Sequence, residues 1–129
     1  MNTRLSSTLA AALAMAASTA HAHHSFATFD MKKTVTVTGE VKDFQWSNPH
    51  IWILLTVPGP NGTATDWSIE GGGPSALVKQ GITKKTMKAG DKITITVHPL
   101  KDGKPGGDFV SAMLENGKKV GDTGGAGAG

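Results

Sequence analysis

Histidine supplies most of the chemistry that this sequence offers. Four of the histidines lie beyond residue 22, at His23, His24, His50 and His98. If the chain is cleaved after Ala22, His23 gains a free α-amine beside its imidazole, and one residue then offers two nitrogen donors in one chelate ring. Ordinary pKa values of about 7.7 to 8 for the amine and about 6.5 for imidazole leave both groups available near neutral pH. The pattern is compatible with a copper or zinc site at His23, with His24, His50 and His98 as candidate further ligands.

The same histidines also have ordinary structural explanations. His23 and His24 would stand at the new N-terminus simply because a signal peptidase cuts before them. His50 directly follows the turn residue Pro49. His98 falls at the end of an expected strand, where a polar side chain is solvated. The chain has no cysteine, so soft thiolate ligation is excluded. The metal-binding and the purely structural interpretations both stay open at this point.

Catalytic arrangements find little support in the sequence. Asp66 and Glu70 share one face of an expected strand, but four residues of extended chain separate them too widely for a glycosidase pair. Ser25 beside His24 is adjacency in sequence, without the context of a catalytic triad. The sequence therefore predicts a protein that is not an enzyme. Glu70 is a candidate for a different role, as the carboxylate that orients a ligating imidazole.

A second candidate surface comes from the tryptophans. Trp46, Trp52 and Trp67 lie on or next to expected strands, with Asn48 and Glu70 near them in the chain. Tryptophan in such positions usually packs against a core, but an exposed indole is a natural stacking platform. The alternative function is therefore a metal-free module that binds a small ligand or another exported protein through this face.

The first 22 residues have the features of a secretory signal peptide. A short positive start at 1–4 precedes an apolar run at 5–17, and Ala20-His21-Ala22 is a small-x-small cleavage site. The apolar run is too short to span a membrane, and no later stretch approaches the roughly 20 apolar residues that spanning needs. We expect a periplasmic or secreted protein that does not remain inserted in the membrane.

The charge of the chain argues against nucleic acid as a partner. The formal net charge is +3, and loss of Arg4 with the signal peptide leaves a small excess of lysine over acidic residues. The lysines are scattered, and their doublets at 32–33, 84–85 and 118–119 lie apart from the aromatic residues. A groove that follows a phosphate backbone needs basic and aromatic side chains together.

The pattern of apolar residues predicts a mainly β domain. Expected strands cover 34–46, 50–57, 63–70, 92–100 and 109–115. The first strand changes its apolar parity near Lys42-Asp43, which indicates a bulge and a sharp bend. Asn61-Gly62 predicts a tight hairpin turn, since both residues tolerate positive φ. Pro74 at its first turn and Gly81 just past its end mark a short helix over 74–80.

This order of elements is that of a five-stranded OB-like barrel with a short helix between strands 3 and 4. A small open β-sandwich is the alternative, because the same strands could pack without closing. We assign the domain to residues 23–120. A Gly/Ala-rich tail at 121–129 lacks the apolar residues needed for a core.

Several short motifs resemble those of one protein family. They are His23-His24-Ser25-Phe26, the run from Val35 to Val41, Phe44-x-Trp46-x-Asn48-Pro49-His50, and Trp67-x-x-Glu70. Together they resemble a family of small exported bacterial proteins of uncharacterised function, over nearly all of 23–120. The resemblance implies export and the domain boundaries, and it carries no activity with it. Members of that family carry Trp after the glycine that ends the helix, where this chain has Ile82.

Overall fold

The structure is a computed structural model, and it describes residues 27–122. Its elements in chain order are β1 (Val35–Gln45), β2 (Trp52–Pro58), the 3-10 turn η1 (Pro60–Gly62), β3 (Ala64–Glu70), α2 (Pro74–Lys79), β4 (Lys92–Pro99), β5 (Gly106–Met113) and β6 (Lys119–Gly121). The five strands and the helix expected from the sequence are present. The three-residue strand β6 was not expected. In the described part of the chain, no helix has the length and apolar character needed to cross a membrane.

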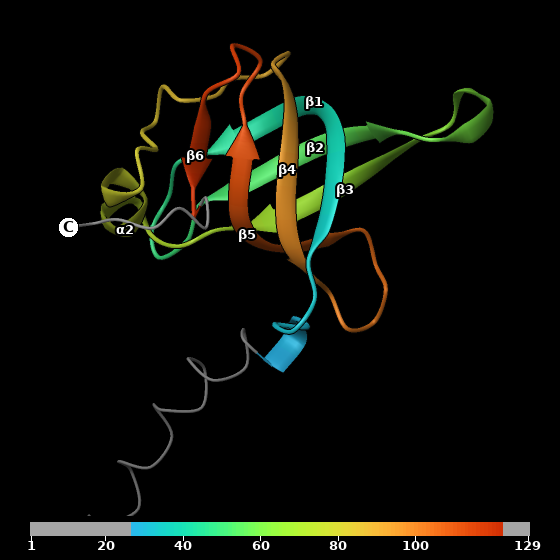
Figure 1. The fold of residues 1–129 in the computed structure, drawn as a ribbon, viewed down its shortest axis with the longest axis horizontal. Helices are drawn as coiled ribbons and strands as arrows, with labels where there is room; N and C mark the ends of the chain where they lie inside the picture. Colours follow the sequence, from blue (N-terminus) through green and yellow to red (C-terminus); the bar gives the residue numbers. More distant parts are fainter. Residues whose placement is uncertain (1–26, 123–129) are drawn as a thin grey trace, which may run out of the picture.

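The strands close into a barrel (Figure 1). Their order is β3-β2-β1-β4-β5-β6, and an additional pairing joins β3 to β5. This closing pair is parallel, while the other neighbours are antiparallel. The OB-like barrel predicted from the sequence is therefore confirmed. The alternative prediction of an open sandwich is wrong. Ser68 to Glu70 of β3 pair with Gly106 to Asp108 of β5, and this pairing closes the sheet into a barrel.

The long strand β1 bends so that it serves two neighbours. Its first half pairs with β4 and its second half with β2, and the register shifts between Val41 and Asp43, where the bulge was predicted. Glu40 is paired with both neighbours, and Gly39 lies directly before it. A Cβ at this position would lie 2.4 Å from the carbonyl oxygen of Thr56, so only glycine allows the two strands to approach so closely.

The barrel interior is filled by aliphatic side chains from alternate strand positions. Together with buried hydrophobic residues from the segments between strands, the buried set is Phe29, Val41, Ile51, Ile53, Leu55, Ile69, Leu77, Ile82, Met87, Ile93, Ile95, Val97, Ala112 and Val120. Leu77 of α2 and Ile82 behind it join the same cluster, so the helix covers one end of the barrel. Ile82 is fully buried within this cluster. Alternation leaves every second strand residue facing outward.

The β2–β3 hairpin extends beyond the rest of the barrel (Figure 1). Its tip turns at Asn61 and Gly62, whose φ values are +59° and +72°. Asn-Gly was predicted to form a tight turn because both residues tolerate such positive φ values. The hairpin also sets the register that brings Glu70, the last residue of β3, opposite Trp52, the first residue of β2.

Candidate functional site

Four outward-facing side chains form a continuous row across four strands. Trp52 of β2 is paired with Glu70 of β3, Glu70 with Asp108 of β5, and Asp108 with His98 of β4. Side chains of directly paired residues point to the same face, with Cβ atoms roughly 5 Å apart. We call these four residues the outer row. It brings an indole, two carboxylates and an imidazole together at the end of the barrel where β3 and β4 finish and β5 begins.

His50 adds a second imidazole to the outer row. It lies in the β1–β2 loop, where its carbonyl accepts a hydrogen bond from Ser47 Oγ at 2.7 Å. Its Nδ1 lies 2.6 Å from Oε1 of Glu70. The Glu70 side chain is only 15% exposed and that of His50 41%, so the contact is partly shielded while the imidazole still reaches water. With Nδ1 held by the carboxylate, Nε2 is the nitrogen left to meet a ligand.

His98 is held in the same manner by a different acceptor. Its Nδ1 lies 2.7 Å from the carbonyl oxygen of Lys33. A carbonyl can only accept, so Nδ1 must carry the proton, and in neutral His98 the lone pair is on Nε2. Both imidazoles of the site therefore have Nδ1 engaged by an oxygen. This is the arrangement in which metal-ligating histidines are commonly found.

Asp108 is the functional candidate that sequence reasoning missed. Burial raises the pKa of its carboxyl, and the negative charge of Glu70 acts in the same direction, while His98 and His50 oppose it. The lysine ion pairs of the described residues go to other carboxylates, namely Asp30, Asp66, Asp91 and Asp102. Only the β3–β5 pairing brings Asp108 beside Glu70. No local pattern in the sequence signals such a contact.

The structure separates the aromatic residues that the sequence grouped into one face. Trp52 is 38% exposed and belongs to the outer row. Trp67 and Trp46 are partly buried and pack against the core, where Trp46 meets Phe44 edge to face with ring centroids 5.9 Å apart. Asn48 is exposed in the loop before His50 and precedes a cis peptide bond to Pro49. Of the three tryptophans, Trp52 is the one placed beside Glu70.

The N-terminal histidines His23 and His24 lie outside the described residues. Their point of attachment is nevertheless fixed, because Phe29 bridges to Leu100 directly after β4. The amide of Asp30 donates to the carbonyl of Pro99 at 2.8 Å, and that of Lys101 donates to the carbonyl of Thr28 at 3.0 Å. The described chain thus starts beside the end of the strand that carries His98.

The donor set of this site suits copper or zinc in kind but is not complete within residues 27–122. Imidazole nitrogen and carboxylate oxygen are ordinary ligands for both metals. Over that range, no group of three or more histidine, cysteine or acidic side chains is arranged to hold a metal ion. A metal ion bound by His50 or His98 would therefore need donors from outside that range.

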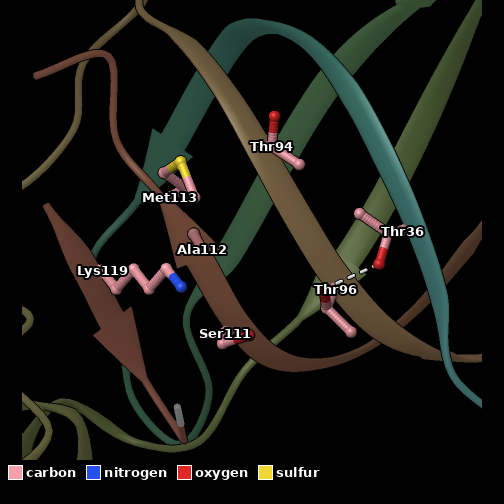
Figure 2. Close-up of a pocket in the computed structure, with 7 residues that line it drawn as sticks. All are labelled: Thr36, Thr94, Thr96, Ser111, Ala112, Met113 and Lys119. Carbon is pink, nitrogen blue, oxygen red and sulfur yellow. Dashed lines mark hydrogen bonds between the residues drawn. The ribbon is translucent and has the colours of Figure 1, made fainter. Parts of the chain in front are cut away.

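A hydroxyl-lined hollow lies on another part of the outer surface (Figure 2). It has a volume of about 240 Å³, and its lining residues are Thr36, Thr94, Thr96, Ser111, Ala112, Met113 and Lys119. Across it, Thr36 and Thr96 share a hydrogen bond of 2.9 Å between their hydroxyl oxygens. Lysine is the one titratable residue type in this lining, so the hollow offers less acid-base chemistry than the outer row.

Comparison with known proteins gives a family and no function. No curated protein and no solved structure matches this chain. A family model matches residues 11–109, which is most of the sequence. The chain belongs to DUF6152, a family of unknown function.

Proposed function

We propose that this protein is an exported, non-enzymatic binding protein that holds Cu(II) or Zn(II) at its processed N-terminus. His23 is the chelating residue, through its α-amine and imidazole. His50 supplies a further imidazole, and Glu70 positions it. His24 and His98 are the remaining candidate ligands. The observation that carries this proposal is the 2.6 Å contact between His50 Nδ1 and Glu70 Oε1.

A carboxylate on Nδ1 makes His50 a better ligand in two ways. It fixes the orientation of the ring, so that less rotational freedom is lost when a metal binds. It also draws the Nδ1 proton toward itself, which raises the basicity of Nε2 and strengthens the bond to a metal. Glu70 is well suited to this role because it ends β3 and is paired on both sides, with Trp52 and with Asp108.

The length of chain between His23 and the barrel allows the approach. Thr28, anchored to Lys101, lies five residues after His23. Five extended residues span about 17 Å. From His98 to Glu70 the outer row crosses two strand spacings, or roughly 10 Å. The tether is thus comparable to the distances that the N-terminal chelate has to cover.

Calorimetry on metal-stripped protein tests this function. The protein that begins at His23 is titrated with Cu(II) and Zn(II), beside a version with one extra N-terminal Gly. We expect submicromolar binding for the native start and a loss of tenfold or more for the extended one, about 1.4 kcal/mol. In the protein with the native start, His50→Ala should weaken metal binding. His98→Ala reports whether His98, whose imidazole is nearer to the point where the chain enters the barrel, also binds the metal. Weak and equal binding by the native and extended proteins would contradict the proposal.

A metal-free ligand or partner surface is the second candidate function. The exposed indole of Trp52 favours it, since a 38% exposed tryptophan on a barrel wall is open to stacking. OB folds also bind ligands through the β2–β3 face and the loops that follow β1 and β4, and His50 and Trp52 lie in this region. Under this function, blocking the N-terminus changes nothing, and Trp52→Ala abolishes binding of the ligand or exported partner.

A further inference from the structure

We infer that the outer row is the docking surface of the protein's own processed N-terminus in the metal-free state. The α-ammonium of His23 lies against the carboxylates of Asp108 and Glu70, and the imidazole of His23 lies near the indole of Trp52. The inference rests on the proposed cleavage after Ala22, and it does not depend on any metal.

The first argument is that two carboxylates stand side by side in the row. Glu70 and Asp108 face each other directly across the β3–β5 seam, and like charges so placed repel. Within residues 27–122 no lysine forms an ion pair with either carboxylate, although the chain as a whole carries a formal charge of +3. A cation placed between the two carboxylates would relieve this repulsion.

The second argument is the identity of the groups around the two carboxylates. Trp52 is an exposed aromatic surface directly opposite Glu70, and indole is the aromatic ring that attracts cations most strongly. His50 binds Glu70 through a ring nitrogen, which leaves Asp108 the less occupied of the two carboxylates. The row therefore favours a cationic guest and disfavours phosphate or other anions.

The third argument is the tether. The chain enters the described structure beside Pro99–Lys101, directly after His98 of the row. His23 lies five residues before Thr28, and five extended residues reach about 17 Å. A short tether gives an effective concentration in the millimolar range. A weak contact can therefore be populated intramolecularly where a free amine at micromolar concentration would not bind. This favours the N-terminus over an outside cation as the guest.

Nuclear magnetic resonance on metal-stripped protein tests the docking. Spectra of the protein beginning at His23 are compared with those of a protein beginning at Ala27, both in excess chelator. We expect shifts at the indole N–H of Trp52 and the backbone amides of Glu70 and Asp108. Asp108→Asn should reduce these shifts at least threefold. Asp102→Asn, in the β4–β5 loop and paired with Lys104 at 3.8 Å, is the matched control and should leave them unchanged.

Two results would overturn the docking. One is a set of shifts confined to Thr28–Asp30 and the adjacent Pro99–Lys101. The other is a dependence of the Trp52 shift on protein concentration, which would mean that the guest is the N-terminus of a second copy. Peak dispersion in the Asp108→Asn spectrum verifies its fold. Because chelator is present throughout, failure here leaves the calorimetric test of metal binding independent, and failure of metal binding leaves this result standing.

Discussion

His50 Nδ1 and Glu70 Oε1 lie 2.6 Å apart, and this contact joins the β1–β2 loop to the last residue of β3. The loop is also held by the Ser47 hydroxyl on the carbonyl of His50, and β3 is paired on both sides at Glu70. An imidazole oriented by contacts from both elements would be positioned in advance for a ligand.

Replacing Glu70 by glutamine tests the role of this contact in metal binding. Glutamine keeps the shape of the side chain and can still accept a hydrogen bond, but it removes the charge that raises the basicity of Nε2. We expect Cu(II) affinity to fall about tenfold, at the lower end of the range for such supporting residues. Glu115→Gln, at an exposed turn position, is the control. Equal Cu(II) affinities of the two variants would show that the contact between His50 and Glu70 has a structural role only.

Asp108→Asn is expected to change the pH dependence of stability in the metal-free protein that begins at Ala27, which lacks His23. Burial raises the pKa of this carboxyl above the ordinary 3.8. The folded protein then binds the proton more tightly than the unfolded chain, so stability falls as pH rises from 3.8 through the folded pKa. Asparagine does not ionise, so the Asp108→Asn variant does not lose stability in this way as the pH rises. Urea titrations should therefore show its advantage over the parent at pH 7 and a smaller advantage at pH 3.

Asp91→Asn is expected to change stability in the opposite direction in the same urea titrations. The Lys88 ammonium, 2.7 Å from Asp91 Oδ1, lowers the pKa of this carboxyl, and the backbone N–H of Lys88 also donates to it. The stabilisation is present above 3.8 and is lost as pH falls through the folded pKa. This variant should be less stable than the parent at pH 7, with the difference shrinking in acid. If both variants are less stable than the parent at pH 7, burial of the Asp108 carboxyl does not determine its effect on stability.

Local patterns in the sequence predict much of the barrel and only part of the site. Alternation places Ile95 and Val97 inside and His98 outside, and the parity change near Lys42 marks the bend of β1. The same alternation puts Trp67 in phase with buried Ile69, which explains why it does not share the outer face with Trp52. Period-two patterning is therefore informative about which face a side chain occupies.

What the sequence could not supply is the contact across the closing seam. Asp108 and Glu70 are far apart in the chain and meet through three residue pairs of a parallel ladder. Pairing of this kind depends on the global topology, and no local propensity encodes it. The short strand β6 escapes detection for another reason, since three residues of Lys-Val-Gly are too few to show any period.

Gly107→Ala tests how tightly β4 and β5 pack against each other beneath the outer row. A Cβ there would lie 2.4 Å from the carbonyl oxygen of His98 and 2.7 Å from a methyl group of Val97. Backbone must shift to admit it, at a cost of about 1 to 3 kcal/mol. Gly72→Ala is the control, because the nearest atom to its Cβ is 3.8 Å away. Urea midpoints measure both variants, and equal midpoints would show that β4 and β5 are free to separate.

Leu55→Ala should be the most destabilising of these changes, because the side chain has no exposed surface and belongs to the core cluster. Removing it leaves a cavity that aliphatic neighbours from other strands fill only in part. We expect a loss of about 2 to 5 kcal/mol in the free energy of unfolding. Val78→Ala, at a 54% exposed position of α2, should stay within about 0.5 kcal/mol of the parent. Metal affinity per folded molecule should be unchanged in both, since neither side chain reaches the outer row. A loss at Leu55 no larger than at Val78 would contradict a close-packed barrel interior.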